Sequence, residues 1–320
     1  MATIISGKEI AKKIREQVGK DVKVLKETSG LKPGLAIVQV GNREDSNVYV
    51  KSKVKQATEL GMNAKHVKLP NTVSQAEVLD RIQELNEDPD CHGIIVQLPL
   101  DCMENIDSAL CTNKVIPEKD VDGINDINAG RLSRGELGNC FIPCTPKGCL
   151  ELIKESDIKV QGANAVVLGR SKIVGSPMAN LLTWNHATVT ICHSRTKNLR
   201  DVVRSGDIVV AAVGVAEMVK GDWIKPGAVV IDCGITAIPD ATKKSGQRLV
   251  GDVDYNECKK AAGWITPVPG GVGPMTVAML LANTVESCKR YAAHSVPQKA
   301  GLSMGLEAMK LIRRIARVRF

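Results

Sequence analysis

The sequence contains few aromatic side chains: its 320 residues include two Phe, three Tyr and three Trp. Proteins that bind single-stranded nucleic acids stack bases on such side chains, so this class of function is disfavoured. The net charge of +8 does not favour nucleic-acid binding either. Residues 296–320 hold six Lys or Arg against one Glu, a net +5, which leaves +3 for the rest of the chain. Because residues 1–295 have nearly equal numbers of basic and acidic side chains, they lack the excess of positive charge that a DNA-binding domain carries. We therefore expect no nucleic-acid partner.

Metal-binding patterns are also missing from the sequence. The ten cysteines are scattered, and the closest grouping, Cys140, Cys144 and Cys149, lacks the paired two-residue spacing of a zinc site. None of the five histidines stands in a metal-binding pattern with another. We expect no metal ion and interpret the cysteines as free, mostly buried thiols in a reducing compartment.

Long apolar runs are absent, since none approaches the roughly 20 residues that a membrane-spanning helix needs. The segment 1–9 has neither the apolar core of a signal peptide nor an arginine-rich transit sequence. These two absences predict a cytoplasmic protein without a membrane span.

In other respects the composition is that of an ordinary globular protein, with 43% hydrophobic and 24% charged residues, and the chain is long enough for two domains. Apolar residues repeat with helical period between Gly7 and Gly30. Strand and helix patterns then alternate, which favours a parallel sheet. Residues 101–146 lack strong periodicity and are rich in Asp, Asn, Pro and Gly, so we predict cleft-lining loops and a hinge there. The predicted strands are 35–40, 64–69 and 93–97, and the predicted helices are 46–60 and 74–85.

A second alternating unit begins near Asn164 and has the pattern of a doubly wound nucleotide-binding domain. A final helix is predicted over 277–291. The fold class predicted from both units is α/β with two domains. The strands of the second unit are expected at 165–168, 187–192, 207–213 and 228–232, with a helix at 174–184.

Three separated segments carry side chains suited to chemistry. Tyr49 and Lys53 are four residues apart on a predicted helix and so share one face. Gln97 and Asp122 each follow an apolar run where a buried strand would end. These segments can therefore meet in one cleft. Ordinary alternatives stay open for each: a tyrosine packed in the core, a solvated lysine, a glutamine that ends a strand, and the turn residue of an Asp-Gly pair.

A candidate dinucleotide site follows the first strand of the second unit. There a strand stops at Gly169 and leads into a helix, so that backbone N–H groups can hold a pyrophosphate. The loop 169–175 lacks the standard Gly-x-Gly-x-x-Gly spacing, and a tight turn without a ligand is the alternative. The next strand ends in Cys192-His193-Ser194-Arg195-Thr196, with no acidic residue to bind a ribose 2′-hydroxyl. A carboxylate would repel a 2′-phosphate, whereas hydroxyl and guanidinium groups bind one, although Ser194 also fits a helix N-cap.

These motifs, together with Pro143-Cys144-Thr145-Pro146 and the run 267–276, resemble the bifunctional methylenetetrahydrofolate dehydrogenase/cyclohydrolase family, and most closely the corresponding portion of its eukaryotic cytosolic trifunctional members. The resemblance extends from about Ile5 to about Tyr291. It implies an N-terminal α/β folate-binding catalytic domain, a Rossmann-like NADP-binding domain, a cleft between them, and a homodimer. The implied boundaries are 1–146, completed by a helix over 276–295, then 147–275, then a basic amphipathic tail over 296–320.

The activity that the resemblance implies has two steps: NADP-dependent oxidation of 5,10-methylenetetrahydrofolate to the methenyl form, then hydrolysis to 10-formyltetrahydrofolate, a step of one-carbon metabolism that supplies purine biosynthesis. Lys53 is the implied proton carrier, Gln97 orients it, Tyr49 stacks on the folate and Asp122 binds the pterin. The residues expected at the substrate are Tyr49, Val50, Lys51, Ser52, Lys53, Val96, Gln97, Leu98, Asp122, Pro269, Gly270, Gly271, Val272 and Gly273. Those expected at the cofactor are Gly169, Arg170, Ser171, Ser194 and Ile235.

The sequence also departs from the family pattern. Ala216 stands where a proline is usual and Thr236 where an asparagine is usual, both in loops expected to border the cofactor. From about residue 297 the chain no longer resembles the linker to a formyltetrahydrofolate synthetase domain, so ATP-dependent ligation is not expected. The alternative function is a catalytically impaired paralogue that binds folate or NADP as a regulatory or interaction module. The presence of Lys53 and Gln97 argues against it.

Overall fold

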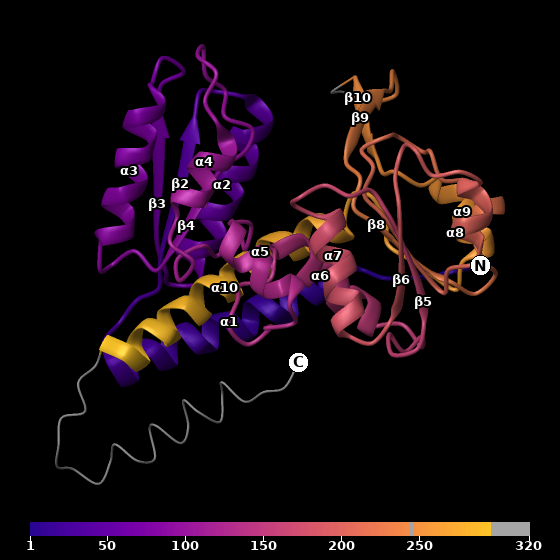
Figure 1. Cartoon of the computed structure of the whole chain (residues 1–320), viewed down its shortest axis with the longest axis horizontal. Coiled ribbons are helices and arrows are strands. Elements are labelled where there is room, and N and C mark those ends of the chain that lie inside the picture. Colours follow the sequence, from indigo (N-terminus) through magenta and orange to yellow (C-terminus); the bar gives the residue numbers. More distant parts are fainter. Residues whose placement is uncertain (244–245, 296–320) are drawn as a thin grey trace, which may run out of the picture.

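The computed structural model describes residues 1–243 and 246–295 and contains two α/β units linked by long helices (Figure 1). The first unit is built on a three-stranded sheet with the order β3-β2-β4, and the second on a six-stranded sheet with the order β1-β11-β8-β7-β5-β6. All strand pairs in both sheets are parallel. The two-domain α/β fold class expected from the sequence is therefore confirmed.

The first sheet consists of β2 (Gly34–Val40), β3 (Asn63–Leu69) and β4 (Gly93–Val96). Every residue of β2 is buried, and alternate side chains enter two separate cores. One core includes α1 (Gly7–Ser29) and α2 (Glu44–Glu59), and the other includes α3 (Gln75–Glu87). Helices on both faces explain why β2 and β4 are almost continuously apolar, whereas the edge strand β3 alternates polar and apolar residues.

The second sheet consists of β5 (Asn164–Leu168), β6 (Thr188–Cys192), β7 (Ile208–Ala211), β8 (Val229–Asp232) and β11 (Trp264–Ile265), and its edge strand is β1 (Thr3–Ile4). The sequence did not reveal β1, which is too short for periodicity to show. Figure 1 places the N-terminus at this second unit. The helical elements of this unit are α7 (Gly175–Trp184), α8 (Leu199–Arg204), η1 (Gly221–Trp223) and α9 (Tyr255–Ala261).

Two helices, α1 and α10 (Val272–Ser295), connect the units (Figure 1). The helix α10 packs against α1 and against α6 (Cys144–Lys154). The buried Asn283 of α10 donates hydrogen bonds from Nδ2 to the carbonyl oxygens of Val121 (2.9 Å) and Ile142 (3.1 Å). These bonds fix the loops on either side of α5 (Asp126–Ser133) to one helix.

Two parts of the sequence-based prediction are wrong. The region 101–146 is not only loops, because it contains α4 (Ser108–Lys114), α5 and the start of α6; Asp107 and Asn125 cap the first two of these short helices. Asp122 does not end a strand, since only the neighbouring Asp120 forms an isolated bridge, to Ile94.

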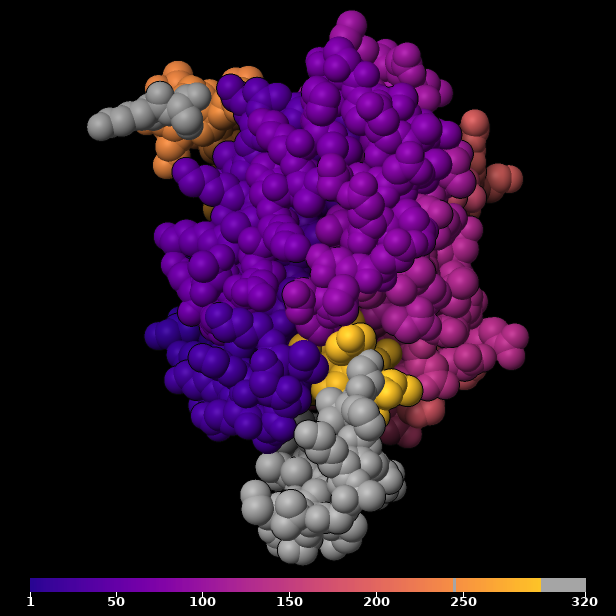
Figure 2. Space-filling view, turned by 90° about the vertical axis from the view of Figure 1, so that its left-hand side faces the viewer, coloured from indigo at the N-terminus to yellow at the C-terminus, as the bar shows by residue number. Residues whose placement is uncertain are grey.

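An antiparallel hairpin of β9 (Thr236–Pro239) and β10 (Gln247–Val250) was also not foreseen, and it projects beside the first unit (Figure 2, orange). The predicted tail, 296–320, lies outside the described residues.

The ten cysteines are all free, and eight of them are buried. Within residues 1–243 and 246–295, no three His, Cys, Asp or Glu side chains are grouped so as to hold a metal ion. Across the same part of the chain, no helix combines the length and apolarity needed to cross a membrane.

The buried Asp120 organises the turn that carries Asp122. Its carboxylate accepts hydrogen bonds from the backbone N–H groups of Gly123 (3.0 Å), Ile124 (3.3 Å) and Asn125 (3.0 Å) and from the Asn128 side chain (2.8 Å). Burial nevertheless raises the pKa of Asp120 to about 6, because desolvation opposes its charge more strongly than these donors favour it.

We predict that Asp120→Asn changes the pH dependence of stability. A raised carboxyl pKa means that the folded protein binds more protons than the unfolded chain between about pH 4 and pH 6, so this group makes the free energy of unfolding fall as pH rises. The substitution removes that fall, about 1 kcal/mol per pH unit between pH 4.5 and 5.5. It also removes one acceptor oxygen, which lowers stability by about 2 kcal/mol. Urea unfolding across this range measures both effects, and parallel curves for the two proteins would contradict the first.

Candidate active site

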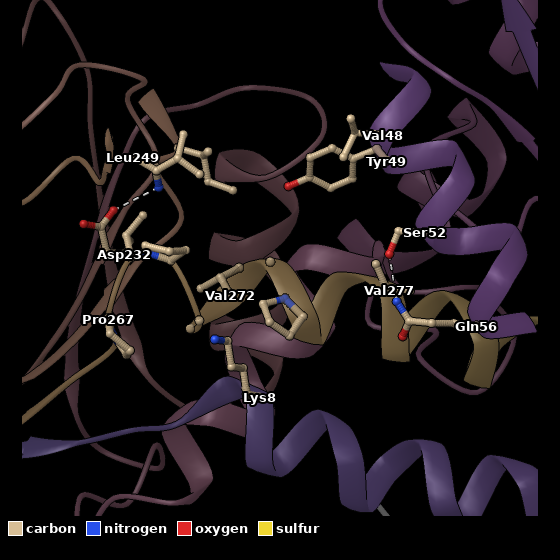
Figure 3. A pocket seen from close by; sticks show the side chains of 18 of the residues that line it. Lys8, Val48, Tyr49, Ser52, Gln56, Asp232, Leu249, Pro267, Val272 and Val277 are labelled. Carbon is tan, nitrogen blue, oxygen red and sulfur yellow. Dashed lines mark hydrogen bonds between the residues drawn. The ribbon is translucent and has the colours of Figure 1, made fainter. Parts of the chain in front are cut away.

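A cavity of about 410 Å³ lies between the two units. Its walls are the inner face of α2, the first half of α1, the loop 267–271, the start of α10 and, from the hairpin, Leu249. Figure 3 shows the Tyr49 ring pointing from α2 across the cavity, with its hydroxyl toward Leu249. Residues from both units thus enclose one space.

Lys53, which follows the cavity-lining Ser52 on α2, forms a hydrogen-bonded pair with Gln97, although neither of the two belongs to the cavity wall, nor does Asp122. Lys53 Nζ donates to Gln97 Oε1 at 2.9 Å, and Gln97 Nε2 donates to the carbonyl oxygen of Leu98 at 2.9 Å. The backbone N–H of Gln97 donates to Val38 at 2.8 Å, which anchors this residue to β2. Lys53 is only 9% exposed. The amide of Gln97 is therefore fixed, with its oxygen toward the lysine.

Asp122 lies in the same region, as the surroundings of Cys144 show. Burial raises the pKa of the Cys144 thiol well above its usual range, the negative charge of Asp122 raises it further, and the positive charge of Lys53 opposes the shift. Lys53 and Asp122 are thus both close to this thiol. The segments containing Tyr49, Gln97 and Asp122, which the sequence placed in one cleft, do come together.

The other residues expected around the substrate are distributed differently. Ser52 lines the cavity, as does the whole run 269–273. Val50 is fully buried in the core, Lys51 is exposed, and neither is part of the cavity wall. Val96 is buried and Leu98 half-buried, both in the core beneath α3.

Two of the three glycines of the run 269–273 are required by the backbone. Gly270 has a φ of 114°, a conformation that other residues rarely adopt. A Cβ on Gly271 would lie 2.7 Å from the Pro267 carbonyl oxygen. The loop can therefore form a smooth wall of the cavity only with glycine at these positions.

The predicted phosphate loop, 169–175, also requires a glycine, at Gly169. Gly169 has a φ of 106°, and a Cβ there would lie 2.1 Å from the Ala212 carbonyl oxygen. Ser171 Oγ accepts hydrogen bonds from the N–H groups of Val174 (3.2 Å) and Gly175 (3.3 Å) at the start of α7. The turn therefore requires glycine, and it leads into the N-terminus of α7 as a cradle of the kind that holds the phosphates of a dinucleotide, with the Ser171 hydroxyl occupying two of its N–H groups in this structure.

Arg170 and Ser194 are both exposed and follow neighbouring strands, since the last residues of β5 and β6 are paired. Neither side chain forms a hydrogen bond or ion pair with any described residue, so both are available for an anion beside the cradle. Ile235 is 47% exposed and lines the cavity.

Two buried aspartates that sequence analysis did not single out hold the loops around this site. Asp232 accepts backbone hydrogen bonds from Gly234 (2.9 Å), Asp252 (2.9 Å) and Val253 (3.1 Å), and burial raises its pKa to about 6. Asp252 Oδ2 accepts from Val213 (2.6 Å) and Gly214 (3.0 Å). The loops carrying Ile235 and the two family departures, Ala216 and Thr236, are adjacent to these bonds. The available signal for Asp232 was an acidic residue at the end of a buried strand, whereas Asp252 follows the largely exposed strand β10 and had no such signal.

The cavity also contains two cations, Lys8 and Arg15, that sequence analysis did not single out. Both belong to α1. On the sequence alone they are ordinary charged residues of a helix surface, and only the folded arrangement brings them to the cavity.

Comparisons with known proteins agree with this architecture. Residues 5–122 match the family model for the tetrahydrofolate dehydrogenase/cyclohydrolase catalytic domain, and residues 143–292 match the model for its NAD(P)-binding domain. The cytoplasmic C-1-tetrahydrofolate synthase of Drosophila melanogaster is 61% identical over 91% of this chain, but the match covers only 30% of that protein. The chain therefore spans about a third of the length of such synthases.

A relative of similar length is the bifunctional protein FolD 2 of Arabidopsis thaliana, 52% identical over 90% of this chain and 96% of that protein. Among solved structures, the Trypanosoma brucei methylenetetrahydrofolate dehydrogenase-cyclohydrolase complexed with NADP cofactor and inhibitor superposes with a TM-score of 0.86. It is 43% identical and covers 90% of this chain and 98% of its own. This chain belongs to the tetrahydrofolate dehydrogenase/cyclohydrolase family.

Proposed function

We propose that this chain oxidises 5,10-methylenetetrahydrofolate with NADP and then hydrolyses the methenyl product to 10-formyltetrahydrofolate. The observation that carries the proposal is the Lys53–Gln97 hydrogen bond near Asp122, on the helix whose Tyr49 and Ser52 line the cavity between the two α/β units. In this proposal residues 1–146 and the helix 276–295 bind the folate, and residues 147–275 bind NADP. The Trypanosoma brucei relative, which covers the same two domains, carries both activities in its name.

For the oxidation, the residues of the chain have to position the substrate. Loss of hydride from the N–CH2–N bridge leaves a cation that both nitrogens stabilise, so no protein acid or base is needed at that step. NADP supplies the hydride acceptor when bound. Gly169 and Ser171 would hold its phosphates at the start of α7, and Ile235 would border its reacting end.

Arg170 and Ser194 would select NADP over NAD. Guanidinium and hydroxyl groups donate to a 2′-phosphate, and charge-assisted bonds of this kind are the stronger ones. The segment 192–196 contains no carboxylate that would repel the phosphate.

The hydrolysis requires a proton carrier, because water loses a proton as it attacks and N5 gains one as the ring opens. We assign this role to Lys53, which donates a hydrogen bond to the fixed Gln97 amide, and Gln97 would also orient the attacking water. Asp122 would bind the donor-rich edge of the pterin, and the Tyr49 ring would stack on the folate. The roles of the flanking Val50, Lys51, Val96 and Leu98 are to shape and support these segments.

The setting proposed for this activity is a cytoplasmic homodimer whose product supplies purine biosynthesis. Relatives are named cytoplasmic, and ten free thiols suit a reducing compartment. The edge strand β6 pairs only with β5 among the described strands, and Ile191 on it is 42% exposed, which favours association through the second unit.

We predict that Lys53→Gln separates the two activities. The glutamine cannot carry a proton, so methenyl hydrolysis should fall about 10²- to 10⁴-fold, whereas methenyl formation with NADP should decline much less, through altered alignment. Both rates are measured separately, with methenyl substrate supplied directly for hydrolysis. Lys55→Gln, an exposed lysine on the same helix, is the matched control and should alter neither rate. Equal losses in both rates would assign the proton transfer to another residue.

A second prediction concerns the choice of cofactor. Arg170→Ala should weaken NADP binding about ten- to a hundredfold, the usual effect of losing one charge-assisted contact, and leave NAD binding nearly unchanged. Titration of both cofactors measures the ratio. Arg200→Ala, which removes an exposed arginine paired with Asp222, should leave the ratio as it is. Equal use of NADP and NAD by the unaltered protein would refute the assignment of Arg170 and Ser194.

A further inference from the structure

The strand β2 carries a buried amide among apolar residues. Gln39 is 1% exposed, and the other side chains of β2 are apolar. It shares a face of the sheet with Leu35 and Ile37, which enter the core that includes α2. An apolar side chain of similar size would be buried there at a lower cost in desolvation. Packing alone therefore does not explain why this position holds an amide.

Hydrogen bonds at both ends of the amide join three elements. Gln39 Nε2 donates to Asn47 Oδ1 on α2 at 2.8 Å, and Gln39 Oε1 lies 2.9 Å from His66 Nε2 on β3. The direction of these bonds follows from Asn47, whose Nδ2 donates to the backbone carbonyl oxygen of Asn42 at 3.4 Å. Because a carbonyl only accepts, Asn47 turns its Oδ1 toward Gln39, and His66 is the donor to Gln39 Oε1.

The start of α2 depends on this network. Its N-cap residue, Arg43, does not cap the helix with a side-chain hydrogen bond. Asn47 is instead tied to β2 through Gln39 and to the preceding loop through Asn42. The apolar contacts of Val50 with the core have no preferred direction and so tolerate a small rotation of α2, whereas a hydrogen bond between two fixed groups does not.

The same stretch of β2 also holds the partner of Lys53. The backbone N–H of Gln97 donates to the carbonyl oxygen of Val38 at 2.8 Å, one residue before Gln39. The strand thus fixes both sides of the Lys53–Gln97 pair: the glutamine through its backbone, and α2 through the Gln39 amide. A rotation of α2 by about 10° would move an atom about 6 Å from its axis by about 1 Å. Displacements of this size can lower a rate by about 10²-fold.

We propose that Gln39 acts as a positioning residue for the hydrolysis. Through Asn47 it fixes the rotation of α2, and this rotation aligns the Lys53 amine with Gln97. The inference rests on the proposed function, in which Lys53 carries the proton. Gln39 itself is buried and is not part of the cavity wall, so it acts through α2 and not on the substrate. The oxidation depends on it less, since only the hydrolysis uses the amine.

The test measures methenyl hydrolysis and methenyl formation in the full chain with Gln39→Met, which keeps the length of the side chain but loses both hydrogen bonds. Hydrolysis should fall about tenfold and formation less than about threefold. Asn47→Ala breaks the same contact from α2 with the best helix-forming residue and should give the same pattern. The double variant should be about as active as the weaker single variant, because both changes remove one contact. Equal losses of the two activities would overturn the inference.

A second measurement separates positioning from a loss of structure. In a Lys53→Gln background no amine is left to align, so adding Gln39→Met should lower the remaining hydrolysis less than about twofold. A merely structural effect would cause the same loss in both backgrounds and would overturn the inference. Asn47→Asp keeps an acceptor for the Gln39 amide and should retain most of the hydrolysis.

Asn86→Leu is the matched control. Asn86 is also a buried amide of the first unit bonded at both ends, to the Lys114 carbonyl oxygen (2.8 Å) and the Ile116 N–H group (3.2 Å), but it lies on α3, on the other side of the sheet. Its loss should lower stability in urea unfolding and leave the ratio of the two activities unchanged. A changed ratio would contradict the assignment to Gln39.

Failure of the proposed function is distinguishable from failure of this inference. Absence of methenyl hydrolysis in the unaltered protein would contradict the proposed function. Crystal structures of the unaltered protein and of Asn47→Ala then test the inference by geometry alone. The distance from Lys53 Nζ to Gln97 Oε1, 2.9 Å here, should exceed about 3.5 Å in the variant, and an unchanged distance would overturn the inference.

Discussion

The geometry of the cleft depends on how α10 is held. Its first residues form part of the cavity wall, and its buried body packs against α1 and α6. Asn283, 1% exposed, bonds to carbonyl oxygens on both sides of α5 and accepts a hydrogen bond from Lys147 at 2.9 Å. A buried amide with these partners is costly to displace. The loops that carry Asp122 and Cys144 are therefore positioned by the same helix that borders the substrate cavity.

Buried aspartates serve as a second kind of anchor, and both units use it. Asp120 accepts hydrogen bonds from backbone N–H groups of the loop that follows it, and Asp232 accepts them from Gly234 directly after it and from Asp252 and Val253 beyond the β9–β10 hairpin. Each carboxylate fixes the path of a loop without contributing to the cavity chemistry. The side chains proposed to act on ligands, Asp122 and Ile235, lie within three residues of such an anchor, so they are held by rigid backbone rather than by contacts of their own.

The sequence allowed much of the fold to be predicted, since helical periodicity located the long helices and apolar runs located the central strands of both units. It failed for β1, α4 and α5, which are too short to show a period, and for the β9–β10 hairpin, whose strands face solvent. The meeting of Lys53 with Gln97 followed from a helical face and a strand end. Lys8 and Arg15 had no comparable signal, because their position at the cavity depends on how α1 packs against the rest of the molecule.

The edge strand β1 has a consequence for the order of folding. Thr3 and Ile4 pair with Trp264 and Ile265 at the margin of the second sheet, whereas α1, which follows directly, packs in the first unit against α10. These pairings join the two ends of the described chain, and contacts this distant in sequence carry a high entropic cost of loop closure. During synthesis the amino-terminal segments must therefore wait for β11 and α10 to leave the ribosome. The second sheet is complete only once β11 has been synthesised, and the packing of α1 only once α10 has been.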